Sequence, residues 1–138
     1  MNKFLTLSFL PTSHDLGLLV LRIGFGGYMI VAHGLPKLMS FADRKDNFPD
    51  PLGLSSPVSL GFTVGAEFFA AAFLIFGLFT RLSATALIFT MGVAFSTMHN
   101  GILIGEGNGE KAVVYLLAFV VILISGGGKY SIDSKRSS

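Results

Sequence analysis

The sequence contains no cysteine and no tryptophan, and few of its residues are charged. Of 138 residues, 51% are hydrophobic and 13% are charged, whereas about a quarter of the residues in a soluble domain carry charge. The lack of cysteine excludes disulfide bonds, thiolate metal sites, iron–sulfur clusters and thiol–disulfide chemistry within this chain. The mean hydropathy of +0.69 favours a membrane protein over a soluble domain.

A strong basic bias is also lacking, since ten Lys and Arg stand against eight Asp and Glu. The basic residues are dispersed, and most lie at the ends of apolar runs, where they anchor helices at a membrane interface. We therefore expect no nucleic-acid partner. Lys3 precedes a short apolar run that Pro11 ends, and no small-x-small cleavage pattern follows. The N-terminus is therefore expected to be retained, within a single domain covering residues 1–138.

Four apolar runs predict an all-α membrane protein, an antiparallel bundle of four transmembrane helices. The runs cover residues 16–39, 58–79, 82–98 and 110–125. About 20 residues cross a bilayer core at helical rise. The fourth run crosses only if Glu110 and the glycines after Ser125 lie among the headgroups. The first polar gap, residues 40–57, is rich in proline and predicts a loop, with a short helix at its start.

Polar and charged side chains interrupt these apolar runs, and lipid makes such residues costly unless they face a partner or a wet cavity. With four antiparallel helices, five of them converge on the half of the bilayer away from the termini. These are His33, Lys37, Glu67, His99 and Glu110. We interpret them as lining a pocket that opens outward, with Glu67 near its floor. The pocket would hold a polar head on an apolar tail, such as a quinone or lipid, or would pass protons.

A purely structural role for the same residues remains open. Glu67 would then pair with His33, Lys37 or Arg22 to hold the helices together. We expect Arg22 and Arg81 to serve in structural ion pairing. No catalytic residue can be assigned from these patterns. We expect no metal site, because the His and Glu side chains come from separate helices without the H-x-x-x-H or E-x-x-H spacing. No covalent cofactor is expected either.

The distribution of positive charge gives an orientation. Four crossings place both termini on one side, which carries five Lys and Arg against four on the other. The cluster of Lys129, Lys135 and Arg136, together with the acidic loops opposite, favours termini in the cytoplasm of a bacterial cell, with the chain in its inner membrane.

Several short motifs, in order, give a resemblance to a known family. They are L-R-I-G and A-H-G-L-P-K-L in the first run, then G-A-E-F, G-L-F-T-R-L, H-N-G and G-G-K-Y-S-I-D. Over about residues 16–133 the chain resembles the DoxX family of small four-helix membrane proteins. The resemblance marks Arg22, His33, Lys37, Glu67 and Arg81 as positions of the family pattern. The family is named for a subunit of an archaeal terminal quinol oxidase complex, and related chains are linked to thiosulfate:quinone oxidoreduction or redox-stress membrane complexes.

The resemblance implies an accessory subunit of a quinone-linked oxidoreductase, with a bound quinone or lipid as ligand. Without cysteine or a cofactor motif, we expect no catalysis by this chain alone. Its expected partners are membrane lipids and either further copies of itself or membrane or soluble partner subunits. Two alternatives stay open: a small proton-coupled transporter or channel-like protein, and a structural or assembly scaffold.

Overall fold

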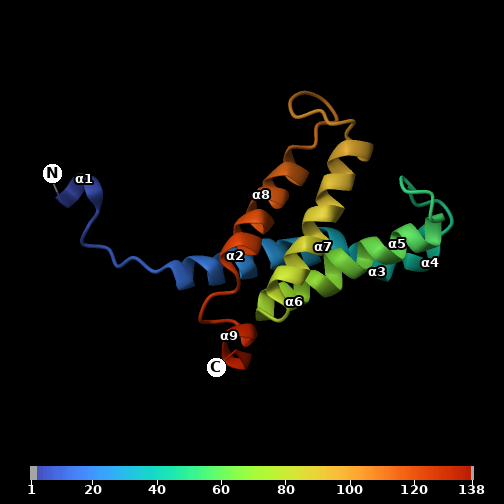
Figure 1. Cartoon of the computed structure of the whole chain (residues 1–138). Coiled ribbons are helices and arrows are strands. Elements are labelled where there is room, and N and C mark those ends of the chain that lie inside the picture. The colour runs from blue at the N-terminus through green and yellow to red at the C-terminus, as the bar shows by residue number, and fades with distance from the viewer. Residues whose placement is uncertain (1–2, 138) are drawn as a thin grey trace.

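Two helical hairpins form the body of the protein (Figure 1). The computed structural model describes residues 3–137, and over that range it contains helices and no strands. The first hairpin goes out along α2 (His14–Met29), the π-helical turn η1 (Ile30–Gly34) and α3 (Leu35–Met39). It returns along α5 (Ser56–Val64), the π-helical turn η2 (Gly65–Ala70) and α6 (Ala71–Phe76). The short α4 (Phe41–Arg44) follows α3 directly, where a short helix is expected.

The second hairpin consists of α7 (Thr80–Val93), extended by the π-helical turn η3 (Ala94–Met98), and α8 (Glu110–Ser125). Two short helices lie at the ends, α1 (Lys3–Thr6) and α9 (Ile132–Arg136). Within the described residues, three helical stretches are long and apolar enough to cross a membrane, namely His14–Met39, Ser56–Phe76 and Thr80–Met98. The 16 residues of α8 rise about 24 Å, which is shorter than a hydrocarbon core of about 30 Å.

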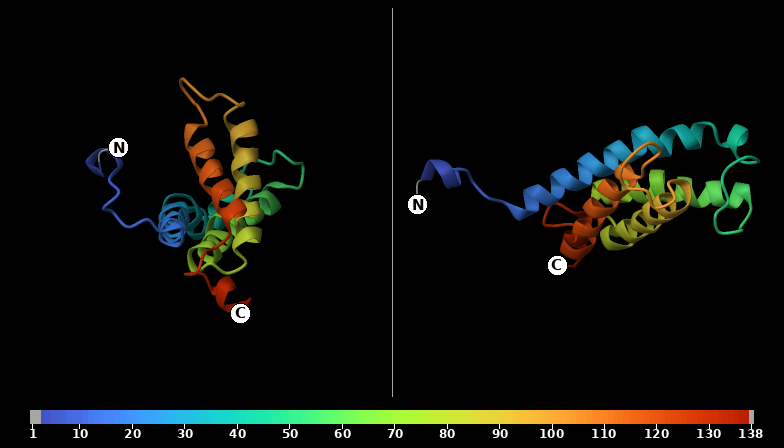
Figure 2. Two further views of the ribbon diagram at one scale, coloured as in Figure 1. Left: turned by 60° about the vertical axis from the view of Figure 1, so that its left-hand side comes forward. Right: turned by 90° about the horizontal axis from the view of Figure 1, so that it is seen from above.

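The two hairpins cross each other instead of lying side by side as in a regular bundle (Figures 1 and 2). They meet around α6 and the first turns of α7 and diverge from there. A buried apolar core fills the crossing, with Met29, Leu74, Leu87, Phe119 and Ile122 fully shielded. The second helix ends at Phe76, three residues before the expected end, because Gly77 turns the chain with φ of 68°.

Arg22 is fully buried where the first helix passes the α6–α7 turn. Its Nη1 donates to the carbonyls of Leu74 at 3.4 Å and Ile75 at 3.1 Å, and its Nη2 donates to Tyr130 O at 3.0 Å. Arg81 donates from Nη2 to Ile124 O at 3.2 Å. Ion pairing was expected for both arginines, but within residues 3–137 neither lies within 4.0 Å of a carboxylate. Both guanidiniums bind backbone carbonyls instead, in the last turns of α6 and α8 and, for Tyr130, in the segment just before α9.

Asp133 joins the C-terminal segment to the start of α7. Its carboxylate accepts from Phe79 N at 2.9 Å and from Thr80 N and Oγ1, each at 2.7 Å. Burial raises the pKa of Asp133, but these hydrogen bonds, together with the nearby Arg136, outweigh burial and hold that pKa below its ordinary value. A carboxylate at a helix N-terminus satisfies unpaired backbone N–H groups and interacts favourably with the helix dipole. Asp133 therefore stabilises the α6–α7 turn.

Replacing Asp133 with alanine should lower the free energy of unfolding by about 1 kcal/mol, the usual loss for a capping side chain. Because the folded pKa lies below the unfolded value of about 3.9, the contribution is complete above that pH and disappears as pH falls through the folded pKa. Thermal unfolding of the purified protein in mild detergent measures the difference. Asp46→Ala, in the exposed first loop, is the control. Equal losses in both variants, or a difference that persists in strong acid, would contradict this role.

Candidate functional site

The site is built where the two π-helical turns of the first hairpin, η1 and η2, touch. Gly34 of η1 is buried, and a Cβ atom there would overlap the backbone carbonyl of Glu67 in η2. Only glycine allows the backbones to approach this closely. π-helical turns inside α-helices are rare and often mark functional positions. The contact fixes the position of Glu67 relative to the first helix.

One ion pair occupies this crossing. Lys37 Nζ lies 2.6 Å from Glu67 Oε2, and the Glu67 side chain is only 6% exposed, that of Lys37 18%. Lys37 Nζ also lies 3.5 Å from His33 O, one turn earlier on the same helix. Of the three partners considered for Glu67, the structure selects Lys37. The attraction between these two opposite charges offsets much of the free-energy cost of removing each of them from water.

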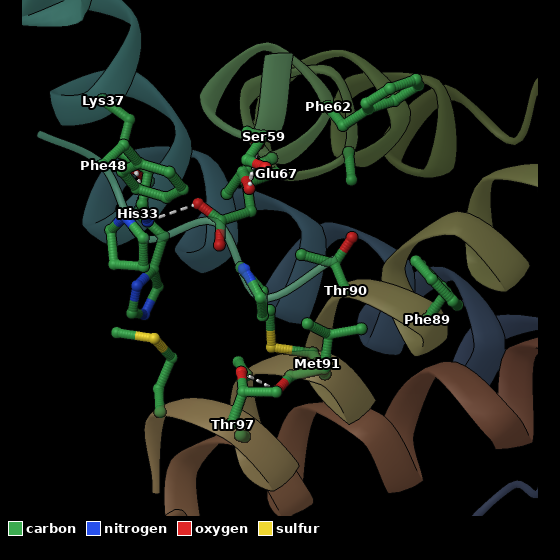
Figure 3. A pocket seen from close by; sticks show the side chains of 18 of the residues that line it. His33, Lys37, Phe48, Ser59, Phe62, Glu67, Phe89, Thr90, Met91 and Thr97 are labelled. Atoms are coloured by element: carbon green, nitrogen blue, oxygen red, sulfur yellow. Dashed lines mark hydrogen bonds and ion pairs between the residues drawn. The ribbon is translucent and has the colours of Figure 1, made fainter. Parts of the chain in front are cut away.

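A cleft of about 1740 Å³ opens between the diverging hairpins next to this ion pair. Figure 3 shows His33, Lys37, Ser59 and Glu67 on one side of it and α7 side chains, among them Thr90 and Met91, on the other. Most of the remaining lining is apolar. The residues predicted to form a pocket all line this one cleft: His33, Lys37, Glu67, His99 and Glu110.

These five residues occupy different depths of the cleft. Lys37 and Glu67 form the buried ion pair, and the half-buried His33 ring packs edge-on against Tyr115 with centroids 5.7 Å apart. His99 and Glu110 lie at the ends of η3 and α8, and Glu110 is exposed. His99 Nδ1 lies 2.9 Å from Gly107 O, so this ring holds the loop between α7 and α8. The inner groups, His33, Lys37 and Glu67, therefore have a different environment from the outer groups, His99 and Glu110. Ligand binding by any of them stays a prediction.

The loop before α5 covers one end of the cleft with apolar side chains, including Phe48 and Leu52. Asp50 holds this loop in place, because Oδ1 accepts from Ser59 Oγ at 2.6 Å and Leu54 N at 2.9 Å, and Oδ2 accepts from Ser55 N at 2.8 Å. The hydrogen bond from Ser59, followed by those from the loop backbone, holds the pKa of Asp50 below its ordinary value. Sequence reasoning missed this residue, although an aspartate between prolines is a turn signal.

Sequence reasoning also missed Tyr115, which lines the cleft from α8. Its side chain is 6% exposed, and its ring contacts those of Phe25, Tyr28, His33 and Phe119. The Tyr115 hydroxyl is buried without a hydrogen-bond partner in the described part of the chain. The sequence feature that could have identified Tyr115 is that it is the single tyrosine within the otherwise apolar residues 112–124. A tyrosine O–H that is buried normally finds a partner.

Comparison with known proteins places the chain in a family. The DoxX family model matches residues 17–100. Two proteins from Haemophilus influenzae, both named "Uncharacterized protein", are similar to the chain. One is 29% identical over 123 residues, covering 85% of this chain and 81% of the relative. The other is 32% identical over 116 residues, covering 78% and 82%. No solved structure matches the chain.

The apolar membrane-length helices and the family match define the class: this is an integral membrane protein. More narrowly, the chain belongs to the DoxX family.

The ion pair predicts a specific pattern of stability. Lys37→Met leaves Glu67 buried without a partner, so it should lower the free energy of unfolding by about 3 kcal/mol. Lys37→Met combined with Glu67→Met replaces both charges with apolar groups and should recover most of that loss. Thermal unfolding of the purified variants in mild detergent gives the comparison. Glu67→Met alone completes the comparison: if its loss and that of Lys37→Met simply add in the double variant, Lys37 and Glu67 are not coupled.

Proposed function

We propose that this chain is an accessory, non-catalytic subunit of a quinone-linked oxidoreductase complex, in which its cleft binds a quinone or a lipid head group. The observation that carries the proposal is the cleft itself: one buried ion pair on a wall that is otherwise mostly apolar. Such a surface complements a molecule with one polar end and an apolar body. The family resemblance supplies the link to quinone chemistry.

The proposal includes a fourth membrane crossing by α8. This helix packs along α7 and also contacts α2, so its apolar face continues the same core. Its 16 residues are followed by Gly126 and Gly127, which extend the segment toward the basic residues at the C-terminus. A short apolar helix can cross where the bilayer thins or where flanking residues reach the interface. With four crossings, both termini lie on one side.

Proton conduction, the principal alternative, has less support. The buried core toward the termini from Glu67 is mostly apolar and includes Met29, Ala71 and Leu74, while the Tyr115 hydroxyl has no hydrogen-bond partner among the described residues. Beyond them the next charged group is Arg22, which is engaged with three carbonyls. A proton pathway needs a continuous file of titratable groups or water, and this layer interrupts it. The arrangement favours a site that binds over a path that conducts.

We propose that redox chemistry belongs to partner chains. The described residues of the cleft include no thiol and no group of three metal-ligating side chains. Large apolar side chains remain exposed along α2, η1 and α7, among them Val20, Val31, Leu82 and Phe89. These suit contact with lipids, further copies of the chain or membrane subunits.

Filling the cleft tests the proposal. Gly65 lines the cleft, and a Cβ atom there would meet nothing within 4 Å, so Gly65→Trp can occupy the space without displacing the backbone. Mass spectrometry of small molecules that co-purify in mild detergent should find a quinone or a defined lipid with the wild type. The amount should fall about tenfold or more in Gly65→Trp, because the indole occupies the binding space.

The matched control is Gly24→Trp. Gly24 is exposed on α2 outside the cleft, and a Cβ atom there also meets nothing within 4 Å. It should retain the co-purified molecule. Glu67→Gln serves as a second probe of the polar end, with Glu106→Gln in the exposed loop as its control. Identical bulk lipid in the wild type and in Gly65→Trp would overturn ligand binding by the cleft.

The orientation has its own test. We propose that both termini face the cytoplasm of the bacterial inner membrane, with the acidic loops outside. Alkaline phosphatase fused after Ser138 should be inactive, because it folds only after export, whereas a fluorescent protein at the same position should mature. Phosphatase inserted at Gly105, between α7 and α8, should be active. Activity of the C-terminal phosphatase fusion would show that the number of crossings is odd or the orientation is reversed.

A further inference from the structure

We infer that the cleft takes an uncharged amphiphile whose polar end is a hydrogen-bond acceptor such as a carbonyl, and that the Tyr115 hydroxyl recognises that end. This inference rests on the proposed binding function and narrows its ligand class. Two independent observations support it: the charge balance of the cleft, and the unpaired hydroxyl of Tyr115.

The charges that line the cleft cancel. Lys37, Arg44 and Lys111 are matched by Asp43, Glu67 and Glu110. The inner cation, Lys37, is already bound to Glu67 at 2.6 Å. Arg44 and Lys111 are exposed at the rim, and Arg44 Nε already donates to Ser40 Oγ at 2.6 Å. Among the described residues, the inner wall therefore offers no cation without a counterion.

An anionic head group at the inner end would have to compete with Glu67 for Lys37. Burying such a head without its own counterion is strongly unfavourable in apolar surroundings. A cationic head would compete with Lys37 for Glu67 in the same way. An uncharged head avoids both penalties, so the balanced charges of the cleft select against charged ligands.

Tyr115 supplies the complementary group. Within residues 3–137 its hydroxyl has no hydrogen-bond partner, although Tyr115 lines the cleft and is only 6% exposed. A buried O–H without a partner is unfavourable, and a ligand oxygen that accepts from it relieves that loss. The His33 ring, which also lines the cleft, lies nearly perpendicular to the Tyr115 ring with centroids 5.7 Å apart, and the fully buried Phe119 ring stacks on Tyr115 at 5.9 Å. The His33 and Tyr115 rings on the cleft wall offer aromatic contact to an unsaturated ring that carries the acceptor oxygen.

Three probes with the same decyl chain test the ligand class. Decylubiquinone is uncharged and carries carbonyl acceptors, decylbenzene has no acceptor, and decyl phosphate is anionic. Binding is measured by titration into the full-length protein in phosphatidylcholine nanodiscs, with Gly65→Trp nanodiscs to subtract partition into lipid. The wild type should bind decylubiquinone more tightly than the other two probes.

Tyr115→Phe tests the recognition residue. It should weaken decylubiquinone binding about tenfold, the usual effect of one hydrogen bond, and leave decylbenzene binding unchanged. Its melting temperature without ligand should be unchanged or higher, because the variant removes an unpaired buried hydroxyl. Tyr28→Phe is the matched control, since the Tyr28 side chain is 66% exposed and does not line the cleft.

The outcomes separate this inference from the proposal it rests on. Binding of decyl phosphate that Gly65→Trp abolishes, as tight as that of decylubiquinone, would overturn the uncharged ligand class while keeping the cleft as a binding site. Unchanged decylubiquinone affinity in Tyr115→Phe would overturn the role of Tyr115. If none of the three probes binds the wild type more tightly than Gly65→Trp, both the inference and the binding function fail.

Discussion

A charged side chain inside an apolar helical protein must find an opposite charge or a set of dipoles, and the pair formed by Lys37 and Glu67 meets this requirement. The two residues lie on different helices, so their attraction specifies how those helices face each other. Gly34 makes the approach possible by removing a side chain from the point of contact with Glu67. The site is therefore a consequence of helix packing as much as of chemistry.

The crossing of the hairpins produces both the core and the cleft. Where the hairpins meet, apolar side chains such as Leu87 and Phe119 exclude all solvent. Where they diverge, the same helices no longer reach each other, and the space between them becomes the cleft. Lys37 and Glu67 lie at the boundary between these regions, so this ion pair is desolvated on the core side and borders the cleft on the other. That setting distinguishes them from a packed ion pair deep in the core.

Hydropathy and spacing are sufficient to place the helices, because lipid-length apolar runs have few alternatives. They also bring five polar residues to one region, since antiparallel connection determines depth. They do not determine which partner Glu67 takes, because that depends on helix rotation, and Gly34 controls the rotation through a contact distant in sequence. The carbonyl partners of Arg22 likewise cannot be predicted from the sequence, since every residue has a backbone carbonyl. The crossing of the hairpins depends on side-chain packing that no periodicity encodes.

The three backbone carbonyls that accept hydrogen bonds from Arg22 lie in two distant parts of the sequence, so they are added at different stages of synthesis. Leu74 and Ile75 belong to the same hairpin, but the third acceptor is the carbonyl of Tyr130, close to the C-terminus. Because a chain is synthesised from its N-terminus, Arg22 precedes all three of its acceptors, and Tyr130 is added more than 50 residues after Ile75. Arg22 therefore ties together three parts of the chain that are far apart in sequence: the first helix, the last turn of α6 and the segment before α9.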